Sequence, residues 1–224
     1  MKNRYLVVVL CIAVLLLASI IPENPLYRIN WALLVTIIIG IIILSSFWFF
    51  EKSEMNTIQI ALIATTASLA AISRVVFAGI VNVQPATFII MITGYIFGPQ
   101  TGFMVGAVCA LVSNFFLGQG PWTPWQMFAW GICGVLGAIM GGSQREYKNI
   151  SFAIFAGVCG YIFGLIMNLW HWIAFVYPLT WKTFLATYAV SLPFDTLHAV
   201  GNVVFVVIFG KAFYTILLRF KKYV

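Results

Sequence analysis

The side chains that could do chemistry in this chain are few, and they recur at helical spacing within apolar runs. Arg74 follows small residues in the run 57–78, and Asn114 follows them in the run 101–117. Polar groups inside a membrane-spanning helix are costly, so they usually face a cavity or a partner. We therefore predict a polar pocket lined by one face of each helix. Its candidate ligand-binding residues are Arg74, Asn114, Gln119, Trp122, Trp125, Gln126, Asn168, His171, Asp195 and His198.

The segment Phe115–Gln126 is the most distinctive connection between the apolar runs. It carries two prolines, two glycines and two tryptophans, which predicts a sharp turn. Tryptophan has an apolar body and a polar edge, which suits a membrane–water boundary. We expect this loop to form a rim or lid over the pocket, with Gln119, Trp122 and Trp125 next to the ligand.

Each candidate also has a purely structural interpretation. Arg74 and Asp195 could form a buried ion pair, and the asparagines could hydrogen-bond between helices. The tryptophans could belong to an interfacial belt. His171 and His198 lie on different helices without cysteine or clustered carboxylate partners, so the sequence predicts no metal site.

Motifs for catalysis are missing from the chain. It has no GxxxxGK[ST], HExxH or GxSxG sequence, and Asp195 is the one carboxylate within the spans of residues 57–218. We therefore expect neither an enzyme nor a bound cofactor. A carrier driven by protons or sodium ions usually needs buried acids, so transport would depend on an external source of energy.

The elements that position these residues are transmembrane helices. Of 224 residues, 63% are hydrophobic and 8% are charged, whereas soluble domains carry about 25% charged residues. The composition predicts an all-α polytopic membrane protein, with Pro193 breaking or kinking the start of the last span. The eight predicted spans are 4–22, 31–50, 57–78, 84–98, 101–117, 123–142, 151–177 and 185–218.

Basic residues indicate how the chain is oriented. The net charge is +7, but these side chains gather at span ends, which predicts orientation and not nucleic-acid binding. One side of the membrane holds eight of them and the other only Arg28 and Lys182, so both termini are expected to be cytoplasmic. The predicted parts are two N-terminal spans that form an appendage (1–50), a six-helix membrane domain (57–218) and a basic tail (219–224).

The tract from Thr87 to Gly142, TGYIFGPQTGFMVGAVCALVSNFFLGQGPWTPWQMFAWGICGVLGAIMG in its main part, resembles a known family. Together with the alanine-rich run Ala67–Ala71 and the six-helix plan, it is similar to the substrate-binding S components of energy-coupling factor (ECF) transporters. Within that family the tract is most similar to the cobalamin-specific branch. The two N-terminal spans depart from the six-helix plan.

The resemblance implies a function. Such subunits bind a vitamin at the outer end in the plasma membrane, and they dock on a coupling protein with two ABC-type ATPases. The AxxxA motif would contact the coupling protein through Ala67 and Ala71, with Ala64 and Ser68 as a second pair. Cobalamin or a related corrinoid is the expected ligand, and thiamine-, pterin- and queuosine-like molecules are alternatives. An intramembrane enzyme of cofactor remodelling is the alternative from another class, but it would need acidic motifs that the chain lacks.

Overall fold

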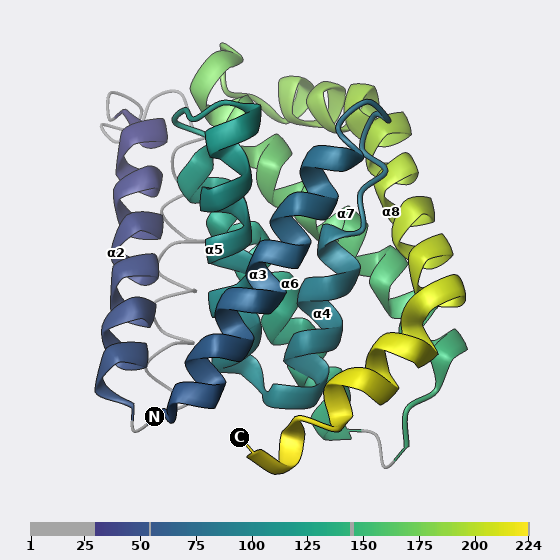
Figure 1. The fold of residues 1–224 in the computed structure, drawn as a ribbon. Coiled ribbons are helices and arrows are strands. Elements are labelled where there is room, and N and C mark those ends of the chain that lie inside the picture. Colours follow the sequence, from purple (N-terminus) through teal and green to yellow (C-terminus); the bar gives the residue numbers. More distant parts are fainter. Residues whose placement is uncertain (1–29, 54, 144–145, 224) are drawn as a thin grey trace.

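The computed structural model describes residues 30–53, 55–143 and 146–223, which form a bundle of helices (Figure 1). Within these residues there is no strand, so the all-α prediction is confirmed. The helices are α2 (Trp31–Lys52), α3 (Thr57–Val76), α4 (Ala86–Phe97), α5 (Pro99–Leu117), α6 (Thr123–Ser143), α7 (Asn149–Phe175) and α8 (Trp181–Leu218), followed by the 3-10 turn η2 (Lys221–Tyr223).

Every described α-helix except α4 is long and apolar enough to cross a membrane, as a polytopic membrane protein requires. The predicted spans from residue 31 onward agree with these helices to within four residues at either end. The first predicted span, 4–22, lies outside the described residues. The upper end of the bundle, as drawn in Figure 1, carries the connections 77–85, 118–122 and 176–180, and the lower end carries the described C-terminal residues.

Helix α4 is the short helix at the centre of the bundle. Its 12 residues span about 18 Å at 1.5 Å per residue, which is less than the roughly 30 Å of a hydrocarbon core. Figure 1 shows that α4 begins well below the upper ends of its neighbours. Only Gly98, with a φ of 96°, separates α4 from α5, so the two helices form a tight hairpin at the lower end. The short α4 leaves room above its N-terminus.

Glycines let α4, α5 and α6 pack with their backbones in contact. A Cβ atom on Gly94 or Gly102 would overlap with the carbonyl of Gly134 on α6, and one on Gly137 would overlap with the backbone of Met91 on α4. Helices in lipid associate through such close van der Waals contacts between small residues. These glycines therefore bring the three helices together.

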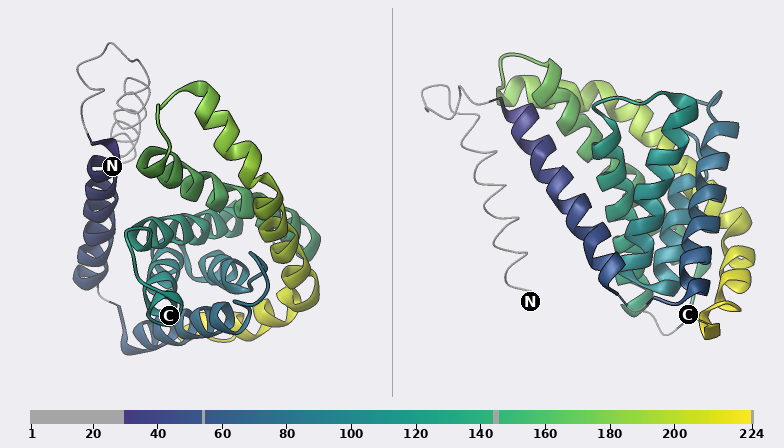
Figure 2. Two further views of the ribbon diagram at one scale, coloured as in Figure 1. Left: turned by 90° about the horizontal axis from the view of Figure 1, so that it is seen from above. Right: turned by 60° about the vertical axis from the view of Figure 1, so that its left-hand side comes forward.

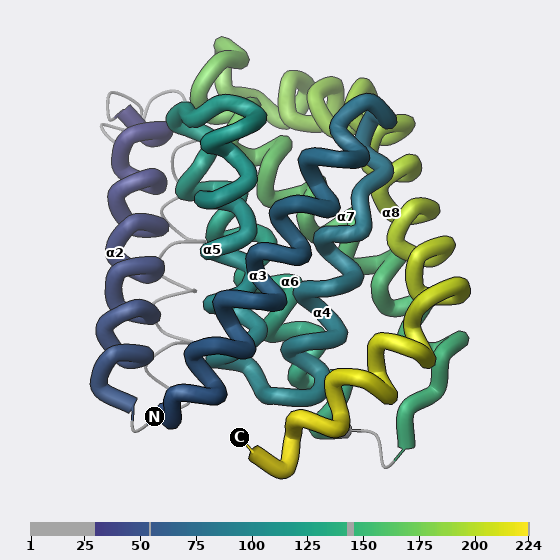
Figure 3. The backbone as a smooth tube through the Cα atoms, in the orientation of Figure 1, coloured from purple at the N-terminus to yellow at the C-terminus, as the bar shows by residue number. Residues whose placement is uncertain are grey.

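Helix α8 runs through Pro193 without interruption and has 38 residues. Figure 3 shows that its first part lies across the upper end of the bundle and that the rest descends along one side. The expected effect of Pro193 is thus a change of direction along a continuous helix, not a break. This path places the N-terminal part of α8 over α7 and its middle beside the space above α4.

Helix α2 packs against the bundle through one face. Its buried residues Trp31, Val35, Ile39 and Ile43 repeat every four positions, and they join the same core cluster as residues of α4, α5, α6 and α7. Trp125 on α6 is 1% exposed and donates a hydrogen bond from its Nε1 to Oγ1 of Thr36 at 2.9 Å. Figure 2 shows α2 at the edge of the bundle. This helix is therefore docked on the bundle by both apolar and polar contacts.

Candidate functional site

A small polar cavity lies above the N-terminus of α4. Its volume is about 60 Å³. The walls come from four helices, α3, α6, α7 and α8, and from the segment 77–85 that connects α3 to α4. The lining residues are Arg74, Asn82, Gln84, Gln126, Trp130, Phe163 and His198.

The segment 77–85 closes the cavity from one side. Asn82 has a φ of 56°, a left-handed conformation that asparagine tolerates better than most residues. Its side-chain amide donates a hydrogen bond to the carbonyl of Phe194 on α8 at 3.1 Å. Because of this bond, the connection turns inward and rests on α8 next to the cavity.

Arg74 is the charged residue of the cavity and is 8% exposed. Its Nη1 atom donates hydrogen bonds to Oγ of Ser113 at 2.6 Å and to Oδ1 of Asn114. The guanidinium lies 4.8 Å from the centre of the Trp130 ring, within range of a cation–π interaction. Its Nε atom is buried and has no hydrogen-bond acceptor within the described part of the chain.

Asn114 links Arg74 to the loop 118–122. Its amide nitrogen donates to Oγ1 of Thr123 at 2.9 Å and to Oε1 of Gln126 at 2.8 Å. Thr123 then donates to Oε1 of Gln119, whose amide donates to the carbonyl of Leu111. The loop is therefore held by a continuous chain of hydrogen bonds that ends at the cavity. Gln119 supports the loop and does not line the cavity.

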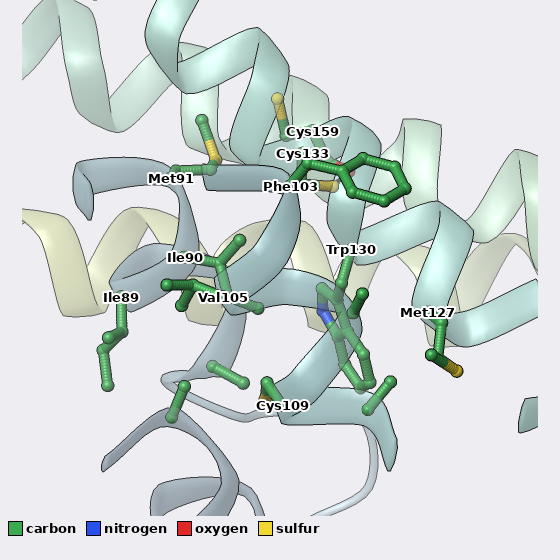
Figure 4. Close-up of a cluster of buried hydrophobic side chains, with 14 of the residues drawn as sticks. Ile89, Ile90, Met91, Phe103, Val105, Cys109, Met127, Trp130, Cys133 and Cys159 are labelled. Atoms are coloured by element: carbon green, nitrogen blue, oxygen red, sulfur yellow. Dashed lines mark hydrogen bonds between the residues drawn. The ribbon is translucent and has the colours of Figure 1, made fainter. Parts of the chain in front are cut away.

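His198 also lines the cavity and is buried. Its Nε2 lies 2.8 Å from Oγ1 of Thr87, in the first turn of α4, and Thr87 accepts a hydrogen bond from Nε1 of Trp130 at 2.9 Å. The ring of Phe163 meets that of His198 edge-on at 5.0 Å. Figure 4 shows Trp130 among the buried side chains of α4, α5 and α6, including Cys109 and Val105. These contacts hold the rings of His198 and Trp130 in place.

A second group of predicted residues lies between α7 and α8, away from the cavity. The amide of Asn168 donates to Oγ of Ser191 at 2.6 Å and to Oδ2 of Asp195 at 2.8 Å. Ser191 donates to the same Asp195 oxygen at 3.0 Å. Asn168 and Ser191 also line an open groove of about 470 Å³ together with His171. Arg74 and Asp195 thus have separate partners, and the ion pair that the sequence left open is not formed in the structure.

The two tryptophans of the segment Phe115–Gln126 lie in different surroundings. Trp125 lies beneath α2 with its indole bonded to Thr36, so it does not line the cavity. Trp122 meets the ring of Trp170 on α7 with centres 6.2 Å apart. The structure therefore divides the ten predicted residues. Arg74, Gln126 and His198 line the cavity, and Asn114 is hydrogen-bonded to the side chains of Arg74 and Gln126. Of the others, Gln119 and Trp122 lie in the loop, Trp125 lies beneath α2, and Asn168, His171 and Asp195 lie at the α7–α8 groove.

Four lining residues were not among the predicted candidates. Asn82 lies between the predicted spans 57–78 and 84–98, and Gln84 is the first residue of the second. Only their polarity next to two apolar runs could have indicated them. Trp130 and Phe163 are aromatic residues in apolar helices, where burial in the core is the usual outcome. Of the described residues, no three or more His, Cys, Asp or Glu side chains gather where they could hold a metal ion.

The four residues expected to contact a coupling protein share one stripe of α3 but differ in burial. Ala67 and Ala71 are buried, at 0% and 2% exposure, whereas Ala64 and Ser68 are exposed. A partner protein could therefore reach Ala64 and Ser68 without any change in the bundle. Ala67 and Ala71 support the packing of α3 in the core cluster.

The fold and the cavity are those of a polytopic helical membrane protein with a small polar site near one end. Residues 54–223 match the model of a family described as "Family of unknown function (DUF6580)", and the chain belongs to this family. Helix α2 precedes the matched residues. No curated protein and no solved structure matches the chain.

Proposed function

We propose that this protein is the substrate-binding S component of an ECF-type importer in the plasma membrane and that it binds a vitamin-type molecule. The observation that carries this proposal is the polar cavity above α4, which contains a buried arginine and is lined by four helices and one connection. Polar groups inside a membrane protein usually mark a substrate path or binding site. The chain would bind its ligand without converting it and would hold no cofactor.

The distribution of basic residues supports an orientation for this function. With both termini in the cytoplasm, the upper end of the bundle faces outward. The cavity would then lie toward the outside, because the connection 77–85 at that end lines it. A ligand from outside would then arrive at the connections 77–85 and 118–122. Both connections are tied to neighbouring helices by side-chain hydrogen bonds.

The volume of the cavity limits what it holds in this conformation. At about 60 Å³ it is well below the roughly 300–1,000 Å³ of sites for drug-sized ligands. Cobalamin or a related corrinoid, the ligand proposed from the resemblance, would bind only after the connection 77–85 moves away from α8. Thiamine-, pterin- and queuosine-like molecules are the smaller alternatives and would need less opening.

Docking on a coupling protein is proposed through the exposed face of α3. Ala64 and Ser68 lie on this face, and shallow apolar grooves flank it. One groove, of about 300 Å³, includes Ser68 and Phe116, and the other, of about 210 Å³, includes Thr65 and Phe220. Small residues between such grooves allow another helix to approach closely in lipid. Two ABC-type ATPases bound to the coupling protein would supply the energy that this chain's motifs do not provide.

Reconstitution tests the proposed function. The purified chain should bind a vitamin alone, and it should import that vitamin into proteoliposomes only when a coupling protein, both ATPases and ATP are present. An intramembrane enzyme of cofactor remodelling would instead convert the compound without these partners. Import that proceeds without the ATPases, or chemical conversion by the chain alone, would contradict the proposal.

A further inference from the structure

The cavity above α4 contains a positive charge with no matching negative charge. None of the described residues that line it is acidic, and Asp195 takes its hydrogen bonds from Asn168 and Ser191. Building on the proposed function, we propose that Arg74 anchors an anionic oxygen group of the ligand, a carboxylate or a phosphate ester. The remainder of the ligand would extend beyond the cavity.

The hydrogen bonds of Arg74 leave part of its guanidinium available. Both acceptors of Nη1, Ser113 and Asn114, are neutral. The residue is more than nine-tenths buried. Its Nε atom nevertheless has no hydrogen-bond acceptor among the described residues. A buried charge is stabilised when it is paired and hydrogen-bonded. Arginine also presents a planar set of donors that matches a carboxylate or phosphate.

The N-terminus of α4 adds a second source of positive potential at the same place. Its N-cap residue is Pro85, which provides no side-chain hydrogen bond to the first turn. The first backbone N–H groups of a helix and its dipole both favour a negative charge. Gln84 and His198 line the cavity, and His198 is bonded to Thr87 in the first turn of α4, so this helix end borders the cavity.

Gln126 contributes a further donor. Gln126 lines the cavity, and its Oε1 atom accepts a hydrogen bond from Asn114. Its amide nitrogen is therefore the atom that can donate to a ligand. Arg74 and Gln126 therefore offer N–H groups from two different helices. Anions accept hydrogen bonds, whereas a cationic ligand would meet only repulsion from Arg74.

The size of the cavity agrees with a head group and not with a whole vitamin. Its volume of about 60 Å³ is a small fraction of the roughly 300–1,000 Å³ of sites that hold a whole drug-sized ligand. The cavity can therefore take one small polar group of the ligand, while the rest of the ligand lies outside it. The cavity therefore selects for a charged group at one end of the ligand.

Titration calorimetry with matched compounds tests this inference on the full chain in lipid nanodiscs. The carboxylate probes are nicotinic acid against nicotinamide and biotin against biotin amide, and the phosphate probe is cobinamide phosphate against cobinamide. In at least one pair, the anionic member should bind at least tenfold more tightly than the neutral one. The pair in which this preference appears identifies the anion as carboxylate or phosphate.

Variants assign the preference to Arg74. Arg74→Gln should abolish it, and Arg74→Lys should keep part of it, because lysine retains the charge but not the planar donors. Lys182→Gln, an exposed position on α8, makes the same change in net charge and should have no effect. If Arg74→Gln does not fold, the comparison of wild type with Arg74→Lys still decides the question.

The outcomes separate this inference from the proposed function. Equal or tighter binding of the neutral members, or a preference that persists in Arg74→Gln, overturns the anion site while the binding function stands. Failure of all six compounds to bind overturns the anion site, whereas the proposed function fails only if no compound of a wider vitamin panel binds.

Discussion

Replacing Gly134 by alanine is a sharp test of the packing that supports the cavity. Gly134 lies on α6, where a Cβ atom would overlap with the backbone of Gly102 on α5, and a Cβ atom on Gly102 would lie 2.6 Å from the carbonyl oxygen of Gly134. Backbone atoms cannot rotate away as a side chain can, so the helices must separate. Overpacking costs about 1–3 kcal/mol, and the upper part of this range, about 2–3 kcal/mol, applies where the overlap is with backbone. The higher helix propensity of alanine returns about 1 kcal/mol.

We therefore expect Gly134→Ala to lower the free energy of unfolding by about 1–2 kcal/mol. By the scaling for soluble chains of this length, that corresponds to a fall of roughly 2–8 °C in the unfolding temperature. A thiol-reactive dye can follow unfolding in detergent, because Cys109, Cys133 and Cys159 are buried and free in the folded protein.

Gly142→Ala is the matched control on the same helix. Nothing lies within 4 Å of a Cβ atom at Gly142, so the substitution should leave the unfolding temperature unchanged or raise it slightly. If Gly134→Ala unfolds at the same temperature as this control, α5 and α6 do not pack with their backbones in contact. The account of the cavity walls would then be wrong.

Three further predictions concern other parts of the molecule. In a double-mutant cycle, Thr36→Val and Trp125→Phe should show a coupling energy of about 1 kcal/mol, measured by thermal unfolding, because they share one hydrogen bond; additive effects would refute the docking of α2. Ala64→Trp and Ser68→Trp should each abolish vitamin uptake into cells while leaving ligand binding unchanged, since both residues are exposed; normal uptake would exclude this face of α3 as the docking site. Asp195→Leu should destabilise the fold by about 1–2 kcal/mol through the loss of two hydrogen bonds, with calorimetric affinity for the ligand preserved; a loss of affinity would transfer the ligand site to the α7–α8 groove.

The helices from residue 31 onward were predictable because long apolar runs bounded by charged residues, proline or glycine have few alternatives in a membrane. The central position of α4 was not. Its length indicated an irregular or tilted span, but only the structure shows that it begins low in the bundle and leaves a cavity above it. That arrangement depends on how the neighbouring helices pack, which residue spacing along one helix does not determine.

The candidate site was predictable in part for a related reason. Helical spacing assigns polar residues to one face of each helix, but it does not say which neighbour that face meets. Arg74 and His198 line one cavity, whereas Asn168 and Asp195 bond to each other across α7 and α8. Trp125 was expected beside the ligand, yet α2 covers it, because a helix from outside the six-helix domain packs on that surface.

Equilibrium binding to the purified chain, without coupling protein or ATPases, tests the central claim most directly. Vitamins and their precursors would be titrated against the wild type and against Gln126→Phe, in which the larger side chain fills the cavity above α4. We predict saturable binding of at least one compound at one site per chain and at least a tenfold loss of affinity in the variant. The absence of binding across the panel, or equal affinity in the folded variant, would contradict the account.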